Sequence, residues 1–396
     1  MKKFLTLIIF IFFFNNILFF VYSQKKIFSS TDERSRSSRN LVVRVDQIIA
    51  GKFPKLEVYV TVVDGENKPI LSLIKGNFDV LVDGKSIGSK FKIEGFQYTE
   101  DPIEYAVITS ANGMMAGETL AEQQKAAIFL FEQLRPQDRM SYYTFGEEVK
   151  SAFEHEKKDE KLLEKITETE LLGFNPHLYD VLVQVARRVN ETKIKRKVII
   201  IMTDGREIGS KYTEEQVLRV IDDINIPVYS VGIRLMAGQN LHRINGISEH
   251  TGGGYIFTPE VSDIPKGMGL INDQIRLGYV FNCKVTGIKG DDQHHQIEVK
   301  VNYKGEDSSF FKNFFARRVP VPLWLKIVII AAIILVLAVL ILSFILIRRS
   351  ARKRMGISKR KCPVCKRRMK DDWDECLFCK YLPPKKKKKK KGEFEE

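Results

Sequence analysis

The chain has 396 residues and a formal net charge of +15, and this charge is unevenly distributed. Residues 348–396 hold 20 Lys and Arg against 7 Asp and Glu, whereas residues 24–325 hold 41 against 42. The longer segment therefore lacks the basic excess of a nucleic-acid-binding domain. Of the 5 cysteines only Cys283 lies in it, which excludes an internal disulfide there. Its stability must come from its own core, and its roughly 300 residues leave room for two domains.

The first residues have the pattern of a secretory signal peptide. Two lysines precede the apolar run Phe4–Phe14, and Val21-Tyr22-Ser23 supplies the residues that a signal peptidase reads. We therefore predict a signal peptide over residues 1–23, with an uncleaved anchor as the alternative. The run contains no cysteine, which excludes a lipoprotein. Residues 24–40 are polar and rich in serine and are predicted to form a flexible leader.

Two separate segments show the period-two alternation of β-strands. In the first, the apolar runs are Leu41–Val45, Lys55–Asp64, Phe78–Val82 and Phe91–Phe96, separated by turn signals such as Asp64-Gly65 and Asp83-Gly84. In the second, they are Leu277–Thr286 and Ile297–Tyr303. We predict that residues 41–100 and 277–320 join as one β-sandwich, with the intervening domain inserted in it.

Between these segments, residues 101–276 alternate between strand and helix patterns. The predicted strands are Tyr105–Ser110, Arg139–Phe145, Lys197–Met202, Val228–Ile233 and Tyr255–Phe257. The predicted helices are Thr119–Leu134, Leu178–Val189, Glu214–Ile224 and Pro265–Ile275. Lys197–Met202 is a continuous apolar run, which is typical of a strand buried on both faces of a parallel sheet. This alternation predicts an α/β fold with a doubly wound, mostly parallel sheet and helices on both faces.

Three blocks of this region resemble the von Willebrand factor A family. They are Val107–Met115 (Val-Ile-Thr-Ser-Ala-Asn-Gly-Met-Met), Gly173–Val181 (Gly-Phe-Asn-Pro-His-Leu-Tyr-Asp-Val) and Ile199–Arg206 (Ile-Ile-Ile-Met-Thr-Asp-Gly-Arg). With Gly252-Gly253 before a strand, they cover about 150 residues in the order of a doubly wound sheet. The flanking β segments also resemble bacterial members of the family that carry a sandwich around the A domain.

The resemblance implies a metal-ion-dependent adhesion site, in which oxygen ligands and a partner's carboxylate surround Mg²⁺. Carried over by position, the family's ligands fall on Thr109, Ala111, Gly113, Pro176 and Asp204. Only Asp204 offers a carboxylate, and Mg²⁺ demands several oxygens at about 2.1 Å. We therefore expect a vestigial site without Mg²⁺. The alternative is a metal-dependent adhesin whose site is completed by unusual loops.

Loops at the carboxyl ends of parallel strands form a crevice where partners dock. Here Met114, Met115, Phe174 and His177 form a candidate face for a protein partner. The alternative is that these side chains pack back onto the domain. The sequence has neither a His-Glu-x-x-His nor a Gly-x-Ser-x-Gly motif, so we do not expect an enzyme.

Residues 324–347 are predicted to form a transmembrane helix. Within them Ile327–Ile347 is apolar except for Ser343, and its 21 residues would span roughly 32 Å as a helix. The basic residues 348–361 follow directly, which places the C-terminal tail in the cytosol and the large domain outside, as in a type I membrane protein. A buried helix in a soluble core would leave this basic segment unexplained.

Two Cys-x-x-Cys pairs, separated by ten residues, form a predicted metal site over residues 362–380. Its ligands are Cys362, Cys365, Cys376 and Cys379. Two such turns facing each other make a closed tetrahedral site for structural Zn²⁺. The spacing resembles the small zinc-ribbon family, although Lys366 and Lys380 stand where that family usually has glycine.

Residues 381–396 contain the seven-lysine run Lys385–Lys391, which cannot fold alone. Next to a membrane it would attract anionic lipid headgroups. Nucleic acid binding and a solvated tail without a specific partner are the alternatives.

These patterns together suggest a bacterial cell-envelope protein. We expect a membrane-anchored, extracytoplasmic A domain that mediates metal-independent protein–protein interaction in adhesion, scaffolding or assembly. The alternatives are a transmembrane sensor, a metal-dependent adhesin, and a membrane-tethered nucleic-acid binder acting through the ribbon and the lysine tail.

Overall fold

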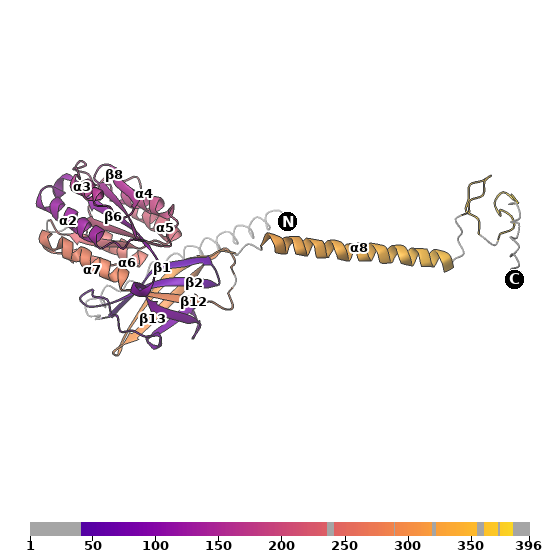
Figure 1. Cartoon of the computed structure of the whole chain (residues 1–396), viewed down its shortest axis with the longest axis horizontal. Helices are drawn as coiled ribbons and strands as arrows, with labels where there is room; N and C mark the ends of the chain where they lie inside the picture. Colours follow the sequence, from indigo (N-terminus) through magenta and orange to yellow (C-terminus); the bar gives the residue numbers. More distant parts are fainter. Residues whose placement is uncertain are drawn as a thin grey trace, which may run out of the picture. The chain divides into compact units, whose positions relative to one another are not determined.

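The computed structural model describes residues 41–235, 241–288, 290–318, 322–354, 360–370 and 373–382 (Figure 1). The predicted signal peptide, the leader and the lysine run lie outside the described residues. The chain divides into two compact units, Met1–Val319 and Pro320–Glu396, and each is described by itself.

A six-stranded sheet forms the centre of the α/β domain. Its strands, in sheet order, are β11 (Tyr255–Thr258), β10 (Val228–Ile233), β9 (Arg196–Thr203), β6 (Ile103–Ser110), β7 (Arg139–Phe145) and β8 (Val149–Glu156). The first five are parallel, and β8 runs antiparallel to β7 at the edge. Every residue of β6 and β9 is buried, because helices cover both faces of the sheet. The predicted doubly wound fold is confirmed.

Successive residues of the central strands point into two different cores. Val107 and Ile200 pack with α2 (Glu118–Glu132), α3 (Lys161–Thr167) and α7 (Ile264–Arg276). Ile108 and Ile201 pack with α4 (Leu178–Asn190), α5 (Glu214–Ile224) and α6 (Leu241–Thr251) on the opposite face. Figure 1 shows these helices on either side of the sheet. The short 3₁₀ turns are η2 (Lys75–Asn77), η3 (Phe96–Tyr98), η4 (Gly113–Met115) and η5 (Val261–Asp263).

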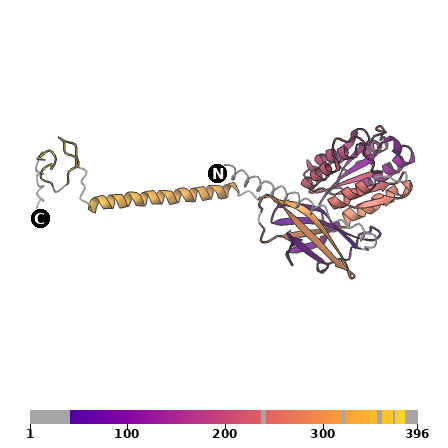
Figure 2. The same ribbon diagram turned by 180° about the vertical axis from the view of Figure 1, so that it is seen from behind.

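The two β segments join as predicted, in two antiparallel four-stranded sheets. One has the order β1 (Leu41–Lys52), β2 (Lys55–Asp64), β12 (Tyr279–Lys284), β5 (Phe91–Gly95). The other has the order β14 (Glu306–Ala316), β13 (Gln293–Tyr303), β3 (Phe78–Val82), β4 (Lys85–Ser86). Their inner faces share one core, in which Val80, Phe281 and Val299 are fully buried. The sheets lie next to the α/β domain in both ribbon views (Figure 2).

The α/β domain is joined to the sandwich through the sheet that contains β2 and β12. Tyr59 of β2 and Val280 of β12 belong to the core of the α/β domain. The Arg196 guanidinium lies 2.8 Å from the Asp46 carboxylate, and both side chains are buried. Lys312 of β14 donates to the backbone oxygens of Asp46 and Thr251. Burial lowers the pKa of Lys312 to about 8.

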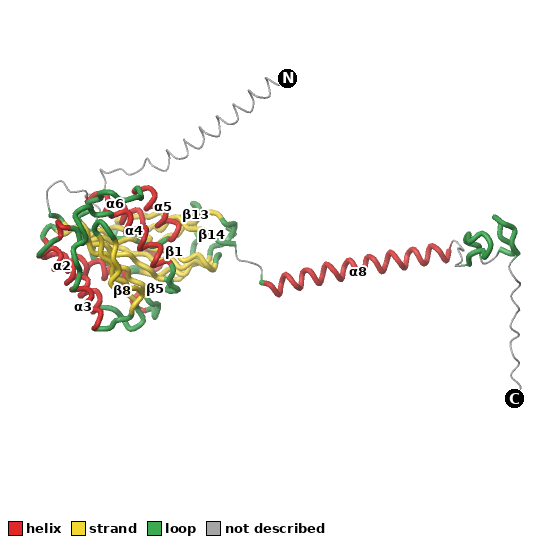
Figure 3. Tube along the Cα trace, turned by 90° about the horizontal axis from the view of Figure 1, so that it is seen from above, coloured by secondary structure: helices red, strands yellow, loops and turns green. Residues whose placement is uncertain are grey.

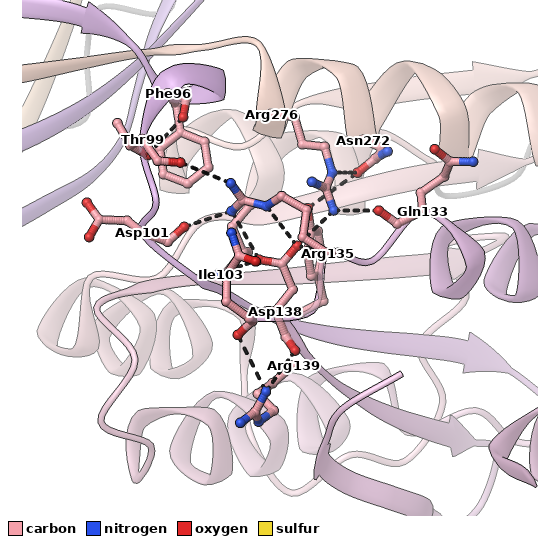
Figure 4. Close-up of polar contacts among 12 residues, drawn as sticks. Phe96, Thr99, Asp101, Ile103, Gln133, Arg135, Asp138, Arg139, Asn272 and Arg276 are labelled. Atoms are coloured by element: carbon pink, nitrogen blue, oxygen red, sulfur yellow. Dashed lines mark hydrogen bonds and ion pairs between the residues drawn. The ribbon is translucent and has the colours of Figure 1, made fainter. Parts of the chain in front are cut away.

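A second buried carboxylate fixes the segment that enters the α/β domain (Figure 4). The Asp138 side chain has no solvent exposure and forms ion pairs with Arg135 at 3.1 Å and with Arg276 at 2.9 Å. The same Arg135 guanidinium donates to the backbone oxygens of Thr99 and Asp101 at 3.2 and 2.7 Å. The entering chain is therefore clamped to the ends of α2 and α7.

The second unit contains α8 (Leu323–Arg354), drawn as a red helix in Figure 3, and the cysteine-rich segment. Among the described residues, α8 alone is long and apolar enough to cross a membrane, judged by length and composition. It includes the predicted span 324–347.

Candidate functional site

The three signature blocks meet at the carboxyl edge of the parallel sheet. Backbone hydrogen bonds join the loop after β6 to the loop before α4: Leu172 N–H donates to Ala111 at 2.7 Å, and Gly113 N–H donates to Gly173 at 2.7 Å. Ile208 N–H, in the loop after β9, donates to Pro176 at 2.9 Å. The three loops therefore form one continuous surface.

The five positions carried over from the family lie in or beneath this surface. Thr109, Ala111, Pro176 and Asp204 are buried, and Gly113 opens η4. Of the five, Asp204 alone carries a carboxylate, and this side chain is only 1% exposed. Its charge must be compensated from within the protein, because water barely reaches it.

Arg206 provides this compensation from two residues further along the chain. Its Nε donates to Asp204 Oδ2 at 2.9 Å, and its backbone N–H donates to Asp204 Oδ1 at 3.3 Å. Burial raises the pKa of the Asp204 carboxyl, while the backbone N–H and the charge of Arg206 act in the opposite direction. The Gly205 residue between them has φ +76°, which brings the two side chains to the same side of the turn.

The same guanidinium also connects the first and third blocks. Arg206 Nη2 donates to Asn112 Oδ1 at 2.8 Å, and Asn112 Nδ2 donates to Ser110 Oγ at 2.9 Å. Asn112 Oδ1 also accepts from the backbone N–H of Met114 at 3.0 Å. The side-chain oxygens of Ser110, Asn112 and Asp204 are therefore engaged in hydrogen bonds within the protein.

Mg²⁺ takes several oxygen ligands in near-octahedral geometry, and the side chains at the five carried-over positions offer few of them. The one carboxylate at the carried-over positions is bound by a guanidinium, and Asn112 Oδ1 accepts from the same group. A side chain at Gly113 would also meet an obstacle, because an added Cβ would lie 2.3 Å from a ring carbon of Phe174. The Phe174 ring fills the space that an oxygen ligand at that position would need.

Residues 107–265 match the family model described as von Willebrand factor type A domain. The doubly wound sheet and the three loops at its carboxyl edge agree with that match. This part of the chain is a von Willebrand factor type A domain.

Solved structures provide a wider comparison for this A domain and its surroundings. Proximal thread matrix protein 1 from the mussel byssus is 12% identical, with a TM-score of 0.41, over 49% of this chain and 50% of that one. The chain thus spans about half the length of the mussel protein.

Two bacterial structures are similar over different shares of the chain. A von Willebrand factor type A protein from Catenulispora acidiphila is 11% identical, with a TM-score of 0.40, over 72% of this chain and 75% of that one. An aerotolerance-related membrane protein from Bacteroides fragilis is 12% identical, with a TM-score of 0.35, over 44% and 98% respectively. No curated protein matches the sequence.

The structure places the residues of the candidate face at different depths in the A domain. Phe174 is 71% exposed and Met114 is 38% exposed. Met115 is fully buried within η4, so its assignment to the face is corrected. His177 is half-buried at the N-terminal end of α4. Ile208, at the end of the segment Asp204–Ile208 that is expected at this edge of the sheet, is 43% exposed in the adjoining loop.

Glu147 supports the loop that carries Phe174. Its Oε1 accepts from the backbone N–H groups of Phe174 at 3.1 Å and Asn175 at 3.3 Å. These two hydrogen bonds lower the pKa of Glu147. Sequence reasoning missed both Glu147 and Arg206, since neither falls on a ligand position of the family. The signals for Arg206 were its place at the end of the third signature block and its distance of two residues from Asp204.

The four predicted zinc ligands meet in the second unit. The Sγ atoms of Cys362, Cys365, Cys376 and Cys379 all lie within 4.8 Å of one another. The Sγ–Sγ distances Cys362–Cys379 and Cys365–Cys376 are 3.4 and 3.6 Å. Both are close to the roughly 3.8 Å that separates two sulfur ligands in a tetrahedral Zn–S₄ site. The cluster could therefore hold zinc.

Each Cys-x-x-Cys turn is closed by a backbone hydrogen bond. Lys366 N–H donates to Cys362 at 2.9 Å, and Lys380 N–H donates to Cys376 at 2.7 Å. Both lysines have positive φ, +57° and +55°, which explains why the ribbon family usually has glycine there. The knuckle geometry is retained despite the substitution.

Proposed function

We propose that the A domain mediates protein–protein interaction without a metal ion, through an interaction face formed by Met114, Phe174 and Ile208 around Arg206. The observation that carries the proposal is the Asp204–Arg206 ion pair at 2.9 Å. A partner carboxylate cannot complete a Mg²⁺ shell where a guanidinium already neutralises the only matching ligand. Recognition would rest on apolar surface, with Met114 and Phe174 as adaptable anchors.

We infer an adhesion, scaffold or assembly role without catalysis. The three side chains that define the face, Met114, Phe174 and Ile208, are exposed and apolar, which suits protein contact and not catalysis. A metal-dependent adhesin remains the competing function, and a response to Mg²⁺ would distinguish it.

For the placement of the chain, we propose a type I membrane protein of a bacterial envelope. Residues 1–23 would direct export, α8 would span the membrane, and residues 348–361 would remain in the cytosol. The domain boundaries 24–40, 41–100, 101–276 and 277–320 would then describe the extracytoplasmic part. The lysine-rich residues 381–396 would contact anionic lipid.

In the cytosolic part, residues 362–380 would bind Zn²⁺ in a structural site. Four thiolates leave no open coordination position, so the metal would fold the ribbon without taking part in a reaction. Burial of Met369 and half-burial of Trp373 against the cysteine cluster support a small folded module.

The proposed interface can be tested by photo-crosslinking in cells of the native organism. A photoreactive amino acid replaces Phe174 or Met114 in the full chain, and Tyr98, which is exposed outside the interaction face, serves as the control position. We expect both face positions to form an adduct with the same protein, with equal yield whether Mg²⁺ is present or depleted. Adducts that form equally from Tyr98, or that disappear without Mg²⁺, would contradict the proposal.

A further inference from the structure

A pocket on the sandwich carries an unusual concentration of lysines. It has a volume of about 710 Å³, which lies in the range of small-molecule sites. Its lining includes six lysines and a single carboxylate, that of Glu57. The lysines are Lys52, Lys55, Lys90, Lys92, Lys195 and Lys284. We name this site the lysine pocket.

Four of these lysines form a row across four neighbouring strands. Lys52 of β1 pairs with Lys55 of β2, and Lys55 pairs with Lys284 of β12. Lys284 N–H donates to the backbone oxygen of Lys90, just before β5, at 2.9 Å. Strands lie about 4.8 Å apart, so the row spans roughly 14 Å. Figure 1 shows β1, β2 and β12 side by side.

The register places this row on the outer face of the sheet. Leu56, Phe91 and Cys283 point into the core of the sandwich, so their neighbours Lys55, Lys90 and Lys284 point the opposite way. Glu57 and Tyr59 lie on the same face of β2 as Lys55, two and four residues further along the strand. Tyr59 packs into the A domain. The lysine pocket therefore lies where the outer face of the sheet emerges from beneath the A domain.

Little within the protein compensates for these charges. Lys195 forms an ion pair with Glu57 at 3.0 Å, and among the described residues none of the other five lysines forms one. Lys90 Nζ donates to Thr286 Oγ1 at 2.8 Å, which supplies a hydrogen bond but no charge. Like charges directly opposite each other destabilise a sheet. Repulsion between neighbouring like charges that the fold does not compensate is typical of a functional site.

We propose that the lysine pocket binds a compact phosphorylated anion, either a free small molecule or a phospholipid headgroup. Lysine binds phosphate as a point charge, and the lining contains lysines without arginine. Residues 24–325 hold 41 basic and 42 acidic side chains, so this part of the chain lacks the net basic excess that favours a long nucleic acid. This site is separate from the interaction face of the A domain.

Lysine footprinting of the full-length chain in neutral detergent tests this site directly. The chain is acetylated with and without inositol hexakisphosphate, and the modified lysines are quantified by mass spectrometry. We expect the acetylation rates of Lys55 and Lys284 to fall at least about fivefold with the compound, while those of Lys85 and Lys300 on the other sheet stay unchanged. Because mass spectrometry reports the acetylation of each lysine separately, protection of the pocket is distinguished from protection of the seven-lysine tail.

Paired variants then measure the contribution of the row. Lys55→Gln with Lys284→Gln should weaken binding in titration calorimetry by about tenfold or more. The matched control, Lys85→Gln with Lys300→Gln, removes the same charge and should change affinity less than twofold. Removing repulsion should also leave the unfolding temperature of the first pair unchanged or raised in the absence of ligand.

The source of the phosphate is distinguished by reconstitution in nanodiscs of phosphatidylcholine or phosphatidylglycerol. Selective protection of Lys55 and Lys284 by phosphatidylglycerol assigns the site to a lipid headgroup. Protection by inositol hexakisphosphate alone assigns it to a free phosphorylated compound. Equal protection of pocket and control lysines, or no protection in either experiment, would overturn the proposal.

Discussion

Asp204 and Arg206 form a nearly neutral pair at the point where the A-domain family places a divalent cation. A buried carboxylate must be compensated, and the fold does so with a guanidinium that also donates to Asn112 Oδ1 at 2.8 Å. We propose that a partner therefore meets a surface whose charge does not depend on the concentration of Mg²⁺.

Replacing this guanidinium should cost stability. In Arg206→Ala the buried Asp204 loses its partner, and we expect the free energy of unfolding to fall by about 2 kcal/mol, since the ion pair is partly exposed. Arg234→Ala, which removes an exposed arginine 4.0 Å from Glu260, should cost less than about 0.5 kcal/mol. Chemical denaturation of both variants measures this, and equal small losses would contradict the role given to Arg206.

The loss in Arg206→Ala should also depend on pH. Burial already raises the pKa of Asp204 in the folded protein, and removing Arg206 raises it further. The folded state then binds more protons than the unfolded state between the unfolded pKa, near 3.9, and the folded value. Stability of the variant therefore falls as pH rises through that window. The deficit against the unmodified chain should be small near pH 3.5 and largest at neutral pH.

Lys312 provides a second pH dependence, of opposite direction. Its folded pKa is about 8, against about 10.4 in an unfolded chain. Between these values the unfolded state binds more protons, so the free energy of unfolding should rise by roughly 2 kcal/mol from pH 8 to pH 10. Denaturant titrations at pH 7.5, 8.5 and 9.5 measure this rise, which Lys312→Met should abolish. The exposed Lys300→Met is the control and should retain it.

At the scale of elements, strong periodic patterns were read correctly and weak ones were not. The buried strand β9 and the helices α4 and α5 follow from continuous apolar runs and a helical apolar stripe. The sequence prediction missed α6, because Asn245-Gly246 interrupts its middle. It also missed β14, whose Glu-Asp-Ser-Ser start is polar and which pairs with β13.

The candidate site was predictable only in part for the same kind of reason. Motif spacing located Asp204, Met114 and Phe174 at one edge of the sheet. It could not show that Met115 turns inward within η4, or that Arg206 folds back onto Asp204. Both depend on backbone turns set by tertiary hydrogen bonds and not on local sequence pattern.

The weak helix α6 allows a direct test of this explanation. Gly246 lies in its interior, an added Cβ would have nothing within 4 Å, and its φ is not positive. Gly246→Ala should therefore raise the free energy of unfolding by about 0.5 to 1 kcal/mol. Gly117→Ala is the matched control, because φ +76° at that position makes alanine unfavourable and should lower it. Destabilisation by Gly246→Ala would contradict the assigned helix.

At the scale of the whole first unit, the A domain has a defined orientation relative to the sandwich. The chain enters the A domain after β5 and returns from α7 into β12, and these crossings are adjacent because Phe96 N–H donates to Gly278 at 2.8 Å. β6 begins at this end with Ile103 and finishes at the interaction face after Ser110. The sandwich thus holds the A domain with its interaction face at the end away from the junction.

The proposed membrane orientation predicts which parts of the chain are accessible from outside. An epitope inserted in the exposed turn at Asp83-Gly84 should be labelled by antibody on intact cells. An epitope after Glu396 should be labelled only after permeabilisation. Labelling of the C-terminal epitope on intact cells would contradict the proposed type I orientation.

The most direct test of metal-independent recognition is thermal unfolding of the purified full-length chain with added Mg²⁺ or Mn²⁺. A cation that binds only the folded A domain would raise its unfolding temperature with concentration. The Asp204–Arg206 pair predicts no change, and the same result for Asp204→Ala. A concentration-dependent rise that Asp204→Ala abolishes would contradict the account.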